Sequence, residues 1–273
     1  MYISLFLGIM TLYLYLIMPR ILNKRDFSKF INKDYAHRGL HDNKSAAPEN
    51  SLKAIKKAVD LGYGIEFDVQ LSKDDIPVVF HDFNLKRVCR LDAKVEDLNY
   101  SELIELKLFN SSERIPTLTE VLEIVDGKVP IIVEFKSNKN TDTKVCDIAA
   151  PLLDEYKGDY MIESFNPFPV LWYKKNRPGV IRGQLSSNFL KERKNSFILD
   201  FMLTNLMFNF LNKPDFIAYH HPDKNNLSLF VNKFLFRTLT VTYTVKSQDE
   251  YEKNKDFFDL LIFEGFIPKR DKV

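Results

Sequence analysis

Short apolar runs alternate with helical patterns from residue 34 to the end of the chain, and this alternation limits the fold more than any other feature of the sequence. It is typical of a mostly parallel sheet, because parallel strands need long crossover connections that are usually helices. The roughly 240 residues that follow residue 33 are a usual length for one (β/α)₈ barrel. We therefore expect an α/β protein with a TIM barrel over residues 34–273 and no domain boundary inside it.

Nine segments have the length and composition of strands, one more than a closed eight-stranded barrel uses. They are residues 34–38, 64–69, 77–80, 130–135, 159–163, 180–185, 215–219, 239–245 and 259–263. The sequence does not identify the additional one. Two helices have clear limits: residues 51–61 carry an apolar stripe that stops at Gly62, and Thr117 with Glu120 has the spacing of a capping box that opens a helix through Val125.

Residues 1–18 carry no charged side chain, and a helix of that length reaches roughly 27 Å, close to the hydrocarbon thickness of a bilayer. We expect a transmembrane anchor here. A cleavable signal peptide fits less well, because it needs a basic start and a small-residue cleavage site before Pro19. A buried core helix is the other alternative.

Residues 19–33 form a basic linker with five lysines or arginines and one acid. The positive-inside rule then predicts a single-pass protein of the cell membrane with its barrel in the cytoplasm.

Charge and cysteine content narrow the function classes. The 39 basic and 37 acidic residues leave a formal net charge of +2, which gives no reason to expect nucleic acid as a partner. Cys89 and Cys146 lack the spacing of a zinc knuckle or a disulfide framework. The oligomeric state stays open.

Two acids alternate with apolar residues in the segment Ile65-Glu66-Phe67-Asp68-Val69. Side chains of a strand alternate between faces, so both carboxylates project from one face and the apolar side chains from the other. In a barrel strand the apolar face packs against the outer helices, and the acids then point inward near the active-site end. A hard cation such as Mg²⁺ or Ca²⁺ is one partner for these acids. A salt bridge to Lys or Arg is the alternative.

The same alternation places Glu134 and Lys136 on one face at the end of another apolar run. Glu134 would add a third oxygen ligand to the predicted cation site. Lys136 would neutralise an anionic group of a substrate, or would only pair with Glu134.

Two histidines follow separate predicted strands, His37 after the first and His81 after the third. Imidazole titrates near neutral pH, so this placement beside three acids favours general acid/base catalysis. Arg38 follows His37 directly, and its guanidinium suits bidentate contact with a phosphate.

Taken together, the motifs resemble those of the glycerophosphodiester phosphodiesterase family in order and in spacing. The matching residues are His37-Arg38-Gly39, Pro48-Glu49-Asn50-Ser51, Glu66-Phe67-Asp68, His81-Asp82 and Glu134-Phe135-Lys136, with weaker matches at Ser164-Phe165 and Tyr243-Thr244-Val245. The resemblance covers about residues 34 to 265, and five short motifs in sequence order are highly specific.

The resemblance implies a bacterial TIM-barrel hydrolase of lipid metabolism, and the uncharged residues 1–18 add the expectation that it is membrane-anchored. Such an enzyme is a phosphoric diester hydrolase that uses a divalent cation, Mg²⁺ or Ca²⁺, to split a glycerophosphodiester into glycerol 3-phosphate and an alcohol. By the family motifs, His37 and His81 resemble the acid/base pair. Glu66, Asp68 and Glu134 resemble the metal ligands.

The same motifs imply a set of substrate-binding residues. Arg38 and Lys136 resemble the residues that contact the phosphate, and Glu49 and Asn50 resemble those that shape the same pocket. Tyr243 stands where many relatives carry Trp and can still stack on a glycerol or a head group. Another departure is Phe263-Glu264 in place of a Thr-Asp pair.

Two other functions stay open on the sequence. The second function is a lysophospholipase D-like activity on lysolipids. The predicted anchor and the Phe-rich residues 197–211 favour it, because they would hold the pocket near lipid. We expect this Phe-rich segment to be a buried barrel helix, with a helix lying on a membrane interface as the alternative. A non-catalytic barrel that binds a glycerophospho-ligand is the third function, and the presence of both His37 and His81 disfavours it.

Overall fold

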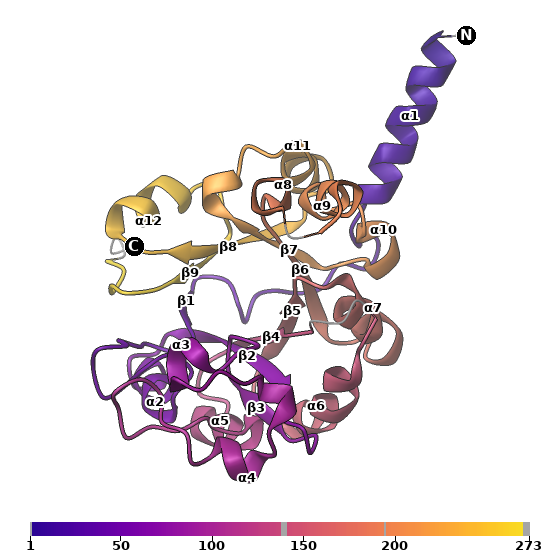
Figure 1. Cartoon of the computed structure of the whole chain (residues 1–273). Coiled ribbons are helices and arrows are strands. Elements are labelled where there is room, and N and C mark those ends of the chain that lie inside the picture. The colour runs from indigo at the N-terminus through magenta and orange to yellow at the C-terminus, as the bar shows by residue number, and fades with distance from the viewer. Residues whose placement is uncertain (1, 138–140, 194, 270–273) are drawn as a thin grey trace.

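Within residues 2–137, 141–193 and 195–269, which the computed structural model describes, eight parallel strands close into a barrel (Figure 1). The strands are β1 (Asp34–His37), β2 (Gly64–Leu71), β4 (Ile131–Phe135), β5 (Tyr160–Ser164), β6 (Ile181–Ser186), β7 (Phe216–His220), β8 (Leu239–Val245) and β9 (Leu260–Phe263). Closure is visible in the pairing, because β1 pairs in parallel with both β2 and β9. The prediction of a TIM barrel is confirmed.

The ninth strand, β3 (Pro77–Val79), lies outside the barrel. It pairs with β2 in the antiparallel direction, with Val79 opposite Val69. On its other side β3 has an isolated bridge, between Val78 and Thr117, and no full strand among the described residues, so a proline at its start is tolerated. All nine predicted strands therefore form, and residues 77–80 are the additional one.

An insertion follows β3 and holds three short helical segments, α3 (Lys86–Cys89), η1 (Val95–Asp97) and α4 (Tyr100–Leu103). It has an apolar cluster of its own, built from Val78, Phe80, Leu85, Val88, Val95, Leu103, Leu108 and Ile115. This cluster fixes the insertion as a small packed unit beside β2.

Helices surround the barrel and begin where the sequence provides caps. They are α2 (Leu52–Asp60), α5 (Leu118–Val125), α6 (Lys144–Glu155), α7 (Pro167–Asn176), α8 (Phe189–Glu192), α9 (Phe197–Thr204), α10 (Asn209–Asn212), η2 (His221–Asp223), α11 (Leu227–Phe230), η3 (Val231–Leu235) and α12 (Gln248–Asn254). The Ser51 side chain caps α2, and the capping box of Thr117 and Glu120 opens α5. Both predicted helices are confirmed.

Alternation along the strands separates two apolar layers. Ile65, Phe67 and Val69 of β2 belong to the cluster that packs between the strands and the helices α2, α5 and α6. A second cluster, which includes Tyr35, Ile132, Met161, Phe216 and Val241, fills the inside of the barrel. The acids that alternate with the outward residues of β2 therefore face the barrel interior.

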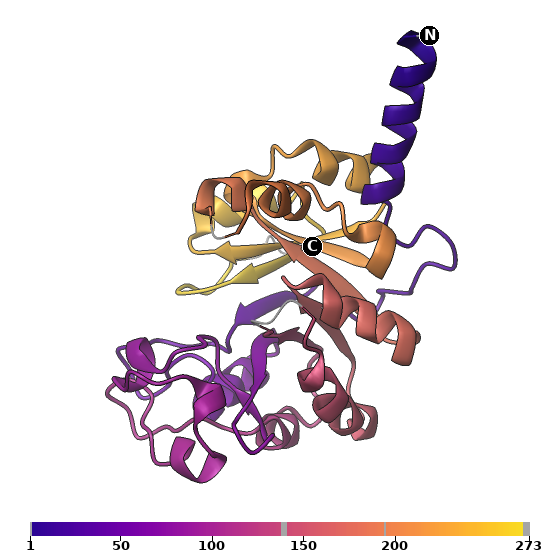
Figure 2. The same ribbon diagram turned by 45° about the vertical axis from the view of Figure 1, so that its right-hand side comes forward.

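The first helix, α1 (Tyr2–Ile17), projects away from the barrel (Figures 1 and 2). Its 16 residues reach about 24 Å, which is less than a hydrocarbon core of about 30 Å. Among the residues that the structure describes, no helix is both long enough and apolar enough to cross a membrane. The transmembrane anchor expected over residues 1–18 is therefore not supported, and the expected location at the cell membrane and in the cytoplasm stays a prediction.

The end of α1 is fixed to the barrel. Ile17 is fully buried, and its carbonyl accepts hydrogen bonds from the side-chain amides of Asn209 (3.0 Å) and Asn232 (3.3 Å). Arg20 follows and pairs with Asp215 at 3.1 Å. These contacts hold the base of α1 against α10 and η3.

Residues 197–211 form two helices, α9 and α10, and the expectation of one buried barrel helix is wrong for α9. Phe197 and Ile198 are 74% and 71% exposed. The buried residues of α9 are Asp200 and Thr204. The helix therefore turns its polar side to the barrel and its apolar side outward.

Candidate active site

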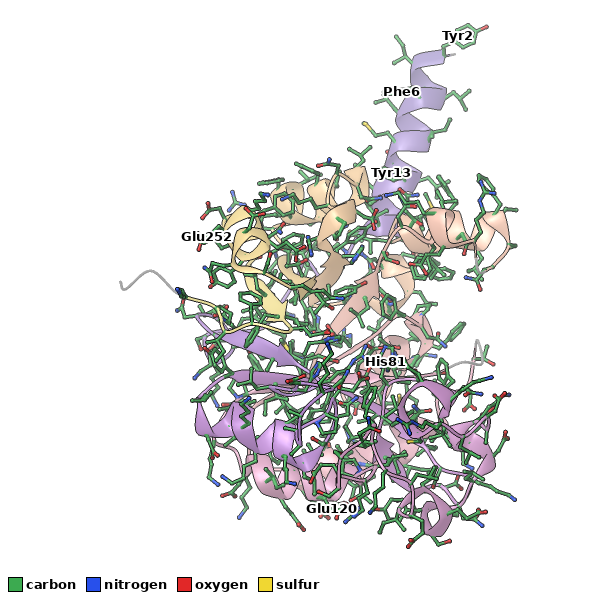
Figure 3. All side chains as sticks on the ribbon, turned by 60° about the vertical axis from the view of Figure 1, so that its left-hand side comes forward. Tyr2, Phe6, Tyr13, His81, Glu120 and Glu252 are labelled. Carbon is green, nitrogen blue, oxygen red and sulfur yellow. The ribbon has the colours of Figure 1, made fainter. Side chains whose placement is uncertain are left out.

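A cavity of about 290 Å³ lies at the carboxyl ends of the barrel strands. Six of the predicted site residues line it. Of the other four, Glu49 and Asp68 contact Arg38, Lys136 contacts Glu134, and Asn50 contacts Asp68. The six are His37, Arg38, Glu66, His81, Glu134 and Tyr243. In Figure 3 the labelled His81 lies near the middle of the molecule.

Strand register brings the three predicted metal ligands together. Asp68 of β2 lies directly opposite Glu134 of β4, and Glu66 precedes Asp68 on the same face. All three are buried, and one carboxylate oxygen from each lies within 4.8 Å of the others. Asp68 Oδ1 accepts no hydrogen bond from any described residue. Three converging carboxylates, one of them with an oxygen that accepts no hydrogen bond from the described residues, fit a hard divalent cation such as Mg²⁺ or Ca²⁺.

Crowding of these acids shows in their pKa values. Burial raises the pKa of Glu66 well above its usual range, and the charges of Asp68 and Glu134 raise it further. Burial also raises the pKa of Glu134, against the opposing charge of Lys136. A bound cation would relieve this repulsion, so the electrostatics and the geometry agree.

Two basic side chains border the carboxylates. Lys136 Nζ lies 2.9 Å from Glu134 Oε1 and 3.5 Å from Asp68 Oδ1. Arg38 Nε lies 3.5 Å from Asp68 Oδ2. The ion pair of Lys136 with Glu134 is thus present. Contact of the Lys136 and Arg38 side chains with a phosphate stays a prediction.

Glu49 and Asn50 support the site without lining the cavity. Glu49 accepts hydrogen bonds from Arg38 (2.8 Å) and from Arg87 (2.8 and 2.6 Å). Burial alone would raise the pKa of Glu49, but the hydrogen bond from Arg87 and the charges of both arginines lower it to about 2. Asn50 Nδ2 donates to Asp68 Oδ2 at 3.0 Å. They therefore fix Arg38 and Asp68 in place.

A tight backbone turn presents the His37-Arg38-Gly39 motif. Arg38 and Gly39 have φ of 55° and 80°, in the left-handed region. A Cβ on Gly39 would lie 2.7 Å from the backbone carbon of Ala54, so only glycine fits. The turn lets the Arg38 amide donate to Glu66 Oε2 at 3.2 Å.

His37 is held by a carboxylate on one ring nitrogen. Its Nδ1 lies 2.7 Å from Glu264 Oε2, and its Nε2 lies 3.8 Å from Glu66 Oε2. A carboxylate at Nδ1 favours the tautomer with its proton on that atom, which leaves Nε2 as an acceptor. Burial lowers the pKa of His37 to about 4. The charge of Arg38 lowers this pKa as well, and the hydrogen bond with Glu264 acts in the opposite direction. A neutral ring near neutral pH suits a general base.

His81 has a matching arrangement. Its Nδ1 lies 2.6 Å from Asp82 Oδ1, and Arg87 Nε donates to Asp82 Oδ2 at 2.7 Å. Gln70 Nε2 donates to the carbonyls of Phe80 (2.7 Å) and Asp82 (3.0 Å). His81 follows the antiparallel strand β3, and the hydrogen bonds from Gln70 hold the residues on either side of it. His81 therefore lies in a cavity that is otherwise built at the ends of parallel strands.

Two acids of the site, Glu264 and Glu163, were not predicted from the sequence to be functional. Glu264, which follows β9, was only a departure from a family pattern, yet it orients His37. Glu163 of β5 lies opposite Glu134, lines the cavity and is buried, and its Oε2 has no hydrogen-bond partner among the described residues. Burial, followed by the charge of Glu134, raises the pKa of Glu163 well above its usual range. The alternation of β5 is the signal that could have found it.

Aromatic side chains form one wall of the cavity. The Tyr243 ring meets Phe165 edge to face with centroids 5.8 Å apart, and its hydroxyl donates to the Ser186 carbonyl at 2.7 Å. With the hydroxyl engaged, the ring is the part of Tyr243 available for stacking on a substrate.

Comparisons with known proteins place these residues in a family context. The model of the Glycerophosphoryl diester phosphodiesterase family matches residues 37–262. A glycerophosphodiester phosphodiesterase of Caldanaerobacter subterraneus is 36% identical over 160 residues, which cover 55% of this chain and 65% of that protein. Human lysophospholipase D GDPD1 is 32% identical over 145 residues, covering 48% and 45%. The chain thus matches less than two thirds of the length of these curated relatives.

Solved structures share the fold. A glycerophosphodiester phosphodiesterase from Thermotoga maritima, 26% identical, has a TM-score of 0.65 over 85% of this chain and 94% of that one. A phosphodiesterase from Oleispira antarctica, solved with the product sn-glycerol-3-phosphate, is 23% identical with a TM-score of 0.70 over 86% and 93%. The latter likeness concerns the fold alone.

Proposed function

Because the chain belongs to the Glycerophosphoryl diester phosphodiesterase family, we propose that it hydrolyses glycerophosphodiesters to glycerol 3-phosphate and an alcohol. The observation that carries this proposal is the cavity in which two carboxylate-bound histidines and three converging acids face one another. The likeness to the glycerophosphodiester phosphodiesterase of Thermotoga maritima, at 26% identity, supports the same activity.

The two histidines supply the proton transfers. His37 Nε2, the free acceptor, takes the proton from the glycerol 2-hydroxyl as that oxygen attacks phosphorus. The bond from phosphorus to the alcohol breaks, and His81 gives its proton to the leaving alkoxide. In the second half, water attacks the cyclic phosphate, His81 takes a proton from the water and His37 returns its proton to the glycerol oxygen. Both residues then regain their starting states.

The acids and the basic residues manage the charge of the phosphate. When bound by Glu66, Asp68 and Glu134, a divalent cation would neutralise negative charge on the phosphoryl oxygens. Arg38 and Lys136 add positive charge at the border of the same acids. The predicted cation is Mg²⁺ or Ca²⁺.

We expect Glu264→Gln to lower kcat roughly 10- to 100-fold with little change in KM, because an amide can present its NH₂ to His37 Nδ1 and favour the wrong tautomer. Glu264→Asp keeps the carboxylate and should recover part of the rate. Steady-state kinetics on a soluble glycerophosphodiester measure both. Equal losses in the two variants, or a change confined to KM, would contradict an orienting role for Glu264.

Lysophospholipase D-like activity is the second candidate, and the match to human lysophospholipase D GDPD1 favours it. The chemistry would be the same, since the bond from phosphorus to the head-group alcohol is the one that breaks. The apolar side chains of Phe165, Leu185 and Ile262 in the cavity wall suit a larger substrate.

One assay separates the functions. The purified chain is incubated with glycerophosphocholine, glycerophosphoethanolamine and a lysophosphatidylcholine, each with and without EDTA. Release of choline or ethanolamine from the first two, stopped by EDTA, is the expected result. Turnover of the lysolipid alone would favour the second candidate. Binding without turnover of any substrate would identify a non-catalytic barrel.

A further inference from the structure

The projecting part of α1 exposes apolar side chains around most of its circumference. Leu5, Phe6, Leu7 and Ile9 are 62%, 65%, 49% and 60% exposed. Successive residues of a helix point about 100° apart, so these side chains spread over more than half of the circumference. The remaining strip carries Ser4, Gly8 and Thr11, and the Thr11 hydroxyl donates to the Leu7 carbonyl at 2.8 Å. Figure 3 shows Tyr2 and Phe6 on the projecting part of α1 and Tyr13 nearer the body.

Two further helical segments present apolar side chains outward. In α9, Phe197, Ile198 and Phe201 are exposed while Asp200 and Thr204 are buried. In α11 and η3, the exposed residues are Leu227 (66%), Phe230 (40%), Phe234 (60%) and Leu235 (61%). Figures 1 and 2 show α1 rising from the side of the barrel that carries α9, α10 and α11. We call these exposed residues of α1, α9, α11 and η3 the apolar surface.

Basic side chains gather where α1 meets the barrel. Lys24 Nζ donates to the carbonyls of Phe236 and Arg237, and the charge of Arg237 adds to burial in lowering the pKa of Lys24. Lys213 lies 5.6 Å from the centre of the Tyr15 ring. Burial of Lys213, followed by the charge of Lys174, lowers the pKa of Lys213. Cations close enough to repel one another complement an anionic surface.

We propose that the apolar surface inserts into one leaflet of an anionic lipid bilayer and holds the barrel at the membrane without α1 crossing it. Residues 2–12 reach about 16 Å, roughly the depth of one leaflet of a 30 Å hydrocarbon core. The basic residues at the base of α1 then lie at the level of the head groups. Apolar helix faces with cations beside them are the features by which interfacial helices bind anionic membranes.

The shape of α1 distinguishes lipid from a protein partner. A partner with a groove covers one stripe of a helix, read as residues three and four apart. Here the consecutive residues Leu5, Phe6 and Leu7 are all exposed and spread over more than half of the circumference, so a groove would leave much of the apolar side of α1 in water. Acyl chains surround a helix completely.

Vesicle flotation tests the proposal with the full chain. We expect it to float with vesicles of phosphatidylcholine and phosphatidylglycerol, more weakly with phosphatidylcholine alone, and less at high salt. Phe6→Glu and Ile198→Glu should each lower the partition coefficient roughly tenfold or more, because each puts a charge in place of an apolar side chain in lipid. Leu61→Glu is the matched control: it also replaces an exposed apolar residue, 54% exposed, but after α2 and outside the apolar surface.

Hydrolysis of a soluble substrate should be unchanged in all three variants, which shows that they fold. Flotation that is absent, or equal in wild type and in Phe6→Glu and Ile198→Glu, would overturn the proposal. A stable dimer that forms without lipid and is lost in the same two variants would also overturn it, since the surface would then bind a second copy.

Discussion

His37→Ala and His81→Ala are each expected to lower kcat by roughly 10²-fold or more, the usual scale for loss of a general acid or base. Each histidine faces the cavity with one nitrogen and is fixed at the other by a carboxylate, Glu264 or Asp82. The fold should persist, because neither ring belongs to the apolar clusters. Initial rates on glycerophosphocholine and circular dichroism measure the two effects.

His221→Ala is the matched control, since His221 lies outside the cavity and its Nε2 contacts the Thr244 carbonyl at 3.3 Å. It should keep a rate near that of the wild type. The His37→Ala/His81→Ala double variant should lose less than the product of the single losses, because both residues act in one proton-transfer cycle. A wild-type rate in either single variant would remove that histidine from the mechanism.

Removal of divalent cations is expected to abolish turnover. Glu66, Asp68 and Glu134 converge with their oxygens within 4.8 Å, and without a cation this negative charge would repel an anionic phosphate. Activity should return when Mg²⁺ or Ca²⁺ is added back, and the better of the two identifies the preferred ion. Glu134→Gln should raise the cation concentration that half-restores activity. Full turnover after exhaustive chelation would contradict the cation site.

Much of the barrel could be predicted because its determinants are local. Each strand is a short apolar run between turn residues, and β2 alternates acids with apolar residues, so the sequence alone places Glu66 and Asp68 on one face. The status of β3 was not predicted, because its initial proline does not distinguish it: the predicted strand over residues 130–135, which lies in the barrel, also begins with a proline. Only its antiparallel pairing with β2 excludes it from the barrel.

The motif residues of the site were predicted, including Glu49 and Asn50, which hold Arg38 and Asp68, but Glu163 and Glu264 were not. A lone acid at a strand end, such as Glu163 or Glu264, belongs to no motif, although the alternation of β5 places Glu163 on the inner face of its strand. Its role depends on which side chain another strand brings opposite it. Strand register supplies that information for Glu163 beside Glu134, and the meeting of β9 with β1 supplies it for Glu264 beside His37.

Apolar composition alone misjudged both α1 and α9. In α1 the run of uncharged residues includes Ile17, which is buried against the barrel and does not extend the projecting part. In α9 the apolar residues suggested a buried helix, but its buried residues are Asp200, which accepts from Asn195 Nδ2 at 2.8 Å, and Thr204. Hydropathy counts side chains without showing which face the neighbours cover.

Phosphorus NMR of glycerophosphocholine treated with the purified chain identifies which phosphorus–oxygen bond breaks. We expect the diester signal to be replaced by that of sn-glycerol 3-phosphate, with free choline, and we expect His37→Ala and His81→Ala to leave the diester intact over the same time. Appearance of phosphocholine, or a diester signal unchanged by the wild-type chain with Mg²⁺ or Ca²⁺ present, would contradict the proposed hydrolysis.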